Sequence, residues 1–146
     1  YASQKAVEQE IDAALAALAQ RFGEHVAPGP VVLIGFSLGA IYASPLAQQH
    51  PERYPRLVLV EGGQKSWTRA TAARFAEKGG LRLFIGCGQA GCVDQARRLT
   101  PVLDKAGLPT RSGGDRRAGH TYDGEVARAV SAELEWLLDG DARWEP

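Results

Sequence analysis

The chain has 146 residues, of which 45% are hydrophobic and 23% are charged. This length suits one domain, which we place over residues 1–146 and which buries roughly 68–70% of its unfolded surface. Lys and Arg balance Asp and Glu, so the formal net charge is +0. A neutral chain lacks the basic surface that nucleic acids or anionic membranes attract. No apolar run approaches the ~20 residues of a membrane span. We therefore expect neither a nucleic-acid partner nor a membrane span.

Helical and extended patterns alternate along the chain. The expected elements are, in order, a helix over 3–22, a strand over 31–36, a helix from 38 to about 50, a strand over 56–61, a helix over 66–78, a strand over 81–86, a helix over 93–106, a weak strand at about 109–113 and a last helix from about 123. Alternation with nearly all-apolar strands predicts an α/β fold, in which helices cover both faces of a mostly parallel sheet. Functional residues of such sheets gather at the C-terminal strand ends.

The segment Gly35-Phe36-Ser37-Leu38-Gly39 joins an apolar strand to a helix. Gly-x-Ser-x-Gly in this context is typical of a nucleophile elbow. We expect Gly35 and Gly39 to prevent collisions between the two backbones, and Ser37 to adopt a strained conformation. Ser37 is then the candidate nucleophile, and the amide of Leu38 at the helix N-terminus is the candidate oxyanion donor. The alternative is a tight turn whose serine has no role.

On residues 31–40 the chain resembles the α/β-hydrolase superfamily. The resemblance covers essentially the whole chain but corresponds to the C-terminal half of a complete hydrolase. It implies that the first strands and a second oxyanion donor lie upstream, so the domain would be N-terminally truncated. It implies no metal and no organic cofactor. One sheet edge would be open and apolar, which a homodimer contact or a partner chain would cover.

His120 is the candidate base because a serine hydroxyl needs a base within hydrogen-bond reach. It follows His50 as the last histidine of the chain and lies in Ala-Gly-His-Thr-Tyr-Asp, between the last strand and the last helix. This resembles the histidine loop of the superfamily, whose residues follow the order serine, acid, histidine. The alternative is a loop histidine that only packs or caps.

The acid has two candidates. The superfamily's usual Gly-x-x-Asp after the strand over 81–86 would place it at Gln89, which has no carboxylate. Glu61 ends the strand over 56–61 and is favoured, which resembles branches such as the haloalkane dehalogenases. Asp94 in the expected loop is the weaker alternative, and capping of a helix would also explain it. If neither is the acid, a backbone carbonyl or a dyad would orient the histidine.

Cys87 and Cys92 enclose Gly-Gln-Ala-Gly. A disulfide loop would imply an oxidising compartment and a secreted protein, whereas two reduced thiols would suit the cytoplasm. A zinc or redox pair is least favoured, because the spacing is not Cys-x-x-Cys and neither a histidine nor a second cysteine pair lies nearby. The compartment therefore depends on whether the pair is bridged.

These residues predict a serine hydrolase that cleaves carboxylic esters or thioesters through an acyl-enzyme on Ser37. We expect a small-molecule ester, because no long insertion between strands suggests a large lid. Phe36, Trp67 and Gln89 are the candidate pocket residues, although core packing explains Trp67 equally well. The alternative function is a non-catalytic hydrolase-fold binding module, or a fragment that needs a missing N-terminal half or a partner.

Overall fold

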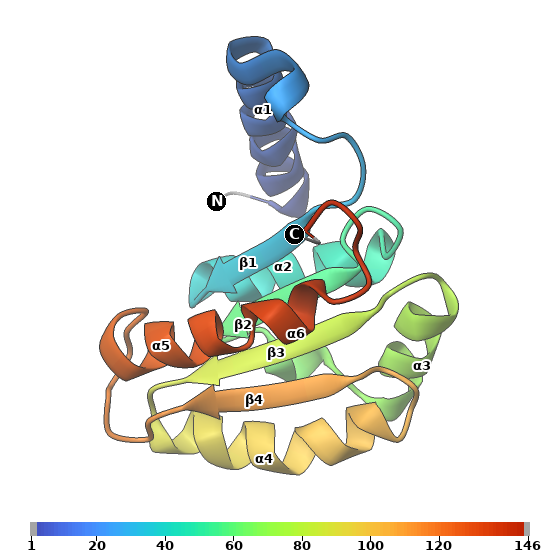
Figure 1. Cartoon of the computed structure of the whole chain (residues 1–146). Coiled ribbons are helices and arrows are strands. Elements are labelled where there is room, and N and C mark those ends of the chain that lie inside the picture. Colours follow the sequence, from blue (N-terminus) through green and yellow to red (C-terminus); the bar gives the residue numbers. More distant parts are fainter. Residues whose placement is uncertain (1–2, 145–146) are drawn as a thin grey trace.

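A computed structural model describes residues 3–144 of the chain. Its centre is one parallel sheet with the strand order β1-β2-β3-β4 (Figure 1). The strands are β1 (Val32–Phe36), β2 (Arg56–Val60), β3 (Arg82–Cys87) and β4 (Thr110–Gly114). Because all four run in the same direction, their C-terminal ends share one edge of the sheet. The predicted parallel sheet is confirmed.

Helices cover both faces of the sheet, as the apolar strands predicted (Figure 1). They are α1 (Gln4–Phe22), α2 (Leu38–Gln49), α3 (Arg69–Glu77), α4 (Ala90–Asp104), α5 (Gly124–Ala132) and α6 (Leu134–Leu138), with short 3-10 turns η1 (Gly23–His25) and η2 (Gln64–Ser66). Helices α2, α3 and α4 pack on one face, and α5 and α6 pack on the other. Within residues 3–144, no helix has the length and apolar character needed to cross a membrane.

The alternation of side chains along β2 divides the core into two layers. Leu57 and Leu59 belong to the cluster formed with α2, α3 and α4, whereas Val58 and Val60 belong to the cluster formed with α5 and α6. All five residues of β2 are buried. A strand buried on both faces has no polar side to alternate with, which explains why the four residues after Arg56 are all apolar.

Strand β1 lies at an edge of the sheet and is much less protected than β2. Ile34 is 47% exposed and Phe36 is 38% exposed. Val32 packs against the α5 and α6 cluster, so the two-residue period of a strand directs Ile34 and Phe36 to that same face. The described residues thus leave an apolar edge, as expected from the sequence.

Three helices differ from their predicted bounds. Helix α3 begins at Arg69 rather than at 66, because Thr68 caps its N-terminus. Helix α4 begins at Ala90 rather than near 93, because Gln89 is already the extended residue that precedes the first turn. The last helix divides at Glu133, which ends α5 and precedes α6 with φ of −98° and ψ of 0°. After this break, Leu137 is buried while Leu134 is exposed.

Candidate active site

Ser37 and Glu61 occupy matched positions, each directly after a strand at the same edge of the sheet. Phe36 is paired with Val60, and the Ser37 amide donates a hydrogen bond of 2.8 Å to the Val60 carbonyl. The Glu61 amide in turn donates to the Gly86 carbonyl at 3.0 Å. These bonds extend the parallel pairing one residue beyond the strands, so Ser37 and Glu61 are held on neighbouring strand ends.

Both residues have a backbone conformation that side chains disfavour. Ser37 has φ of 52° and Glu61 has φ of 55°, and they are the non-glycine residues with positive φ in the described chain. Such conformations persist where the surrounding structure enforces them, and they concentrate at functional sites. The strain expected at Ser37 is confirmed. The matching strain at Glu61 was not predicted.

The turn around Ser37 depends on close backbone approaches. A Cβ atom on Gly35 would lie 2.6 Å from the Cα of Ala40 in α2, which confirms the predicted collision. The same prediction is wrong for Gly39, because a Cβ atom there would meet nothing within 4 Å. Gly62 and Gly63 are tight instead, since a Cβ atom on Gly62 would lie 2.6 Å from the Ser37 carbonyl oxygen and one on Gly63 would collide with the Ala40 carbonyl oxygen. The crowding therefore lies where β1 and the residues after β2 meet Ser37 and the first turn of α2.

Ser37, His120 and Glu61 form a continuous chain of polar contacts. His120 enters from the loop between β4 and α5, and its Nε2 atom lies 2.8 Å from Ser37 Oγ. Its Nδ1 atom lies 3.4 Å from Glu61 Oε2. The other carboxylate oxygen, Oε1, accepts hydrogen bonds from the backbone amides of Gly88 and Gln89. The Glu61 side chain is 1% exposed, and these partners compensate its burial.

The imidazole is positioned by packing as well as by polar contacts. The ring of Phe36 lies 5.1 Å from that of His120 and 6.2 Å from that of Tyr122, between centroids. The Gly119 amide, next to the histidine, donates to the Gly88 carbonyl at 2.7 Å. The loop that carries His120 is therefore tied to the loop that holds Glu61. Phe36 supports the histidine, and it does not line the cavity described below.

The amide of Leu38 is the first of helix α2. Amides in the first turn of a helix have no acceptor within the helix, and the helix dipole favours negative charge at this end. If Ser37 is a nucleophile, as the sequence predicts, an oxyanion would develop beside this turn. The Leu38 amide therefore belongs to the donors that can stabilise such an anion.

Asp94 does not join the Ser37–His120 pair. Its carboxylate lies 3.6 Å from Arg116 Nη2, and its side chain is 44% exposed. Helix capping does not explain Asp94 either, because α4 begins at Ala90 and Asp94 lies within the helix. Among the described residues, the carboxylate paired with His120 is that of Glu61.

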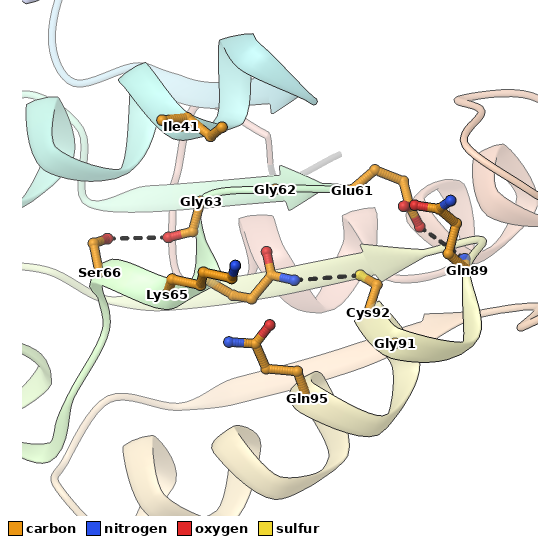
Figure 2. Close-up of a pocket in the computed structure, with 11 residues that line it drawn as sticks. Ile41, Glu61, Gly62, Gly63, Lys65, Ser66, Gln89, Gly91, Cys92 and Gln95 are labelled. Carbon is orange, nitrogen blue, oxygen red and sulfur yellow. Dashed lines mark hydrogen bonds between the residues drawn. The ribbon is translucent and has the colours of Figure 1, made fainter.

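A cavity of about 650 Å³ opens beside Glu61, on the side of α2 and α4 (Figure 2). It is lined by Ile41, Glu61, Gly62, Gly63, Gln64, Lys65, Ser66, Gln89, Gly91, Cys92 and Gln95. Gln89 thus lines a pocket, as expected. Trp67 does not: it is 3% exposed and packs edge-on against Phe75, with ring centroids 5.2 Å apart. The prediction of Trp67 as a pocket residue is wrong, because its ring fills the core.

Cys87 and Cys92 form a disulfide. The bridge joins the last residue of β3 to the first turn of α4 and encloses Gly88 and Gln89, whose amides bind Glu61. Ligand atoms of Glu61 and of both cysteines lie within 4.8 Å of one another. Sulfur atoms bonded to each other are not thiolates, however, so in this state the three residues are not a metal-ligand set.

Two contributors to the site were missed from the sequence. Gly88 supplies an amide to Glu61, and a Cβ atom on it would collide with the Gly119 carbonyl. The glycine directly after a strand was the available signal. Gln64 is buried beside the cavity, and its sequence context offered no signal.

Comparison with known proteins gives no match: no known protein family fits the chain, and no significantly similar protein was found among curated proteins or solved structures. The assignment of a function therefore depends on the residues of the site itself.

Proposed function

We propose that the protein is a serine hydrolase that cleaves carboxylic esters or thioesters through an acyl-enzyme on Ser37. The observation that carries the proposal is the contact chain from Ser37 Oγ to His120 Nε2, 2.8 Å, and from His120 Nδ1 to Glu61 Oε2, 3.4 Å. A nucleophile, a base and an orienting acid in this order are the parts that acyl transfer requires.

In the first half of the reaction, Ser37 Oγ attacks the acyl carbon while His120 Nε2 takes the hydroxyl proton. The Glu61 carboxylate beside Nδ1 favours a proton on that atom, which keeps Nε2 unprotonated beforehand and stabilises the imidazolium afterwards. The Leu38 amide donates to the developing oxyanion. The tetrahedral intermediate then breaks its bond to the leaving oxygen or sulfur, which receives the proton from His120. The acyl group remains on Ser37.

In the second half, a water molecule replaces the alcohol or thiol. His120 takes one proton from the water as its oxygen attacks the acyl carbon, and the same proton passes to Ser37 Oγ as the acyl–serine bond breaks. The products are a carboxylic acid and the free enzyme. The exposure of His120, 45% of its side chain, leaves room for a substrate or water beside Nε2.

The test is intact-mass spectrometry after treatment with a fluorophosphonate, combined with hydrolysis of p-nitrophenyl acetate. We expect one adduct on the wild type, none on Ser37→Ala, and ester hydrolysis by the wild type alone. Circular dichroism checks that both proteins are folded. A folded wild type without an adduct, or a Ser37→Ala variant that still hydrolyses the ester, would contradict the proposal. The first result would favour a non-catalytic binding module.

A further inference from the structure

The contacts among Ser37, His120 and Glu61 leave the cavity beside Glu61 without a role. We propose that this cavity receives the acyl part of the ester, and that it selects acyl groups carrying an amide or hydroxyl, with Gln64 as the residue that determines this specificity. The inference rests on the proposed hydrolase function and deepens it by naming the class of substrate.

The two faces of the sheet assign the two parts of the ester. Phe36 points toward the α5 and α6 face, and the His120 ring packs on Phe36. The leaving oxygen must take its proton from His120 Nε2, so the leaving group lies on that side. The cavity lies on the opposite side, against Ile41 of α2 and Cys92 of α4. The remaining substituent of the acyl carbon is therefore directed toward the cavity.

The cavity wall is largely apolar, and the polar side chains that it does offer are mainly neutral. The carboxamides of Gln64, Gln89 and Gln95 all line it. Figure 2 places the two charged lining residues at opposite ends, with Glu61 beside Gln89 and Lys65 beside Ser66. Glu61 is already engaged by His120 and by backbone amides, and Lys65 is exposed to solvent. Amide groups both donate and accept, so this wall matches a neutral polar group better than a charged one.

The side chain of Gln64 has an oxygen that lacks a hydrogen-bond donor within residues 3–144, and a ligand in the cavity could supply one. It is 7% exposed, yet its Oε1 atom is buried with no hydrogen-bond partner in the described structure. Its Nε2 atom donates to Cys92 Sγ at 3.5 Å, and sulfur is a weak acceptor. An unsatisfied buried oxygen is unfavourable, and the weak contact to sulfur resists rotation of the carboxamide little. A ligand that offers an N–H or O–H in the cavity would give this oxygen its partner when the carboxamide turns toward it.

The test compares two p-nitrophenyl esters with acyl chains of equal length, hexanoyl and N-acetyl-β-alanyl. They share the leaving group and differ by one amide in place of two methylenes. We expect wild-type kcat/KM to be about tenfold higher for the amide-bearing ester, the effect of one added hydrogen bond in a buried site. Gln64→Met, which removes the amide at similar size, should abolish the preference. Gln64→Glu keeps an acceptor oxygen and should retain it. Gln9→Met, on the exposed surface of α1, is the matched control and should behave as wild type.

Each outcome separates this inference from the proposed function. The wild-type ratio needs no variant, so equal rates for the two esters, or a preference for hexanoyl, overturn the inference even if Gln64→Met does not fold. A preference that survives in a folded Gln64→Met protein overturns the role of Gln64. Failure of the fluorophosphonate to label Ser37 in a folded wild type overturns both the function and the inference. Labelling of Ser37 without an amide preference leaves the hydrolase and removes the substrate class.

Discussion

Glu61 links His120 to the loop between β3 and α4. One of its carboxylate oxygens lies 3.4 Å from His120 Nδ1, and the other accepts from the Gly88 and Gln89 amides. The carboxylate is buried, whereas His120 is open on its other side. Orientation of the imidazole therefore depends on a residue that solvent hardly reaches. This arrangement makes the role of Glu61 separable from that of Asp94.

Replacing Glu61 by Gln should lower kcat/KM for an ester on the order of 10³-fold or more, because the neutral amide no longer stabilises the imidazolium and can favour the wrong tautomer. The backbone amides keep an acceptor in the Gln oxygen, so the fold should persist. Asp94→Asn is the matched control and should stay within about threefold of wild type. Steady-state kinetics and thermal unfolding of both variants check this. A larger loss in Asp94→Asn than in Glu61→Gln would move the acid role to Asp94.

The two glycines of the elbow should differ in their tolerance of a methyl group. In Gly35→Ala the new atom meets the α2 backbone at Ala40, and the cost should be about 1–3 kcal/mol of unfolding free energy. In Gly39→Ala the new atom meets open space, and because alanine has the higher helix propensity we expect the unfolding free energy to rise by up to ~1 kcal/mol. Urea unfolding monitored by circular dichroism measures both. Equal destabilisation of the two variants would mean that Gly39 is also sterically constrained.

How much of this site the sequence revealed depends on how local each feature is. The elbow at Ser37 and the loop of His120 were predictable because a strand, a turn and a helix follow one another within a few residues. The parallel sheet was predictable because β2 is apolar at nearly every position. Glu61 was favoured over Asp94 only on a resemblance, since no local pattern distinguishes them.

The features that were missed depend on contacts between distant segments. The close approach at Gly62 requires β2 to pass beneath the first turn of α2, which no pattern within either segment reports. Trp67 is a large aromatic residue of the kind that often lines a pocket, yet it packs against Phe75 and within the core beside the sheet. Gln64 is buried in η2, where it contacts Cys92 of α4. Burial of these side chains is a property of the assembled layers, and periodicity along one element does not determine it.

The disulfide should matter for the site as well as for stability. Cys87 and Cys92 close the loop whose amides donate hydrogen bonds to Glu61. The double variant Cys87→Ser, Cys92→Ser should therefore hold the Glu61 carboxylate less firmly beside His120. We expect a loss of about 2 kcal/mol in unfolding free energy, the effect of closing so short a loop, together with slower labelling of Ser37 by a fluorophosphonate.

Reduction of the wild type provides the control for this prediction. Mass spectrometry should register the gain of two hydrogens on reduction, and the reduced wild type should resemble the double variant in stability and labelling rate. Reductant should not change the double variant further. If the reduced wild type keeps both its stability and its labelling rate, the bridge does not support the site.

Asp141 lies near Arg56, at the N-terminal ends of the strands, and should make the stability of the fold depend on pH in the acid range. Its carboxylate accepts from Arg143 at 2.6 and 2.8 Å and from the buried Arg56 at 3.3 Å. The hydrogen bonds from the Arg143 side chain lower the pKa of Asp141 from 3.8 to about 2; burial opposes this shift, and the charge of Arg56 adds to it. A pKa that is lower in the folded protein stabilises the fold above the unfolded value, and this stabilisation is lost as pH falls through the folded value.

Asp141→Asn should therefore lower the unfolding temperature most at neutral pH, and its difference from wild type should shrink between about pH 4 and pH 2. Asp104→Asn, at an exposed position of α4, is the control and should give a small shift at every pH. A difference between wild type and Asp141→Asn that stays constant down to pH 2 would show that Asp141 acts through packing and not through its charge.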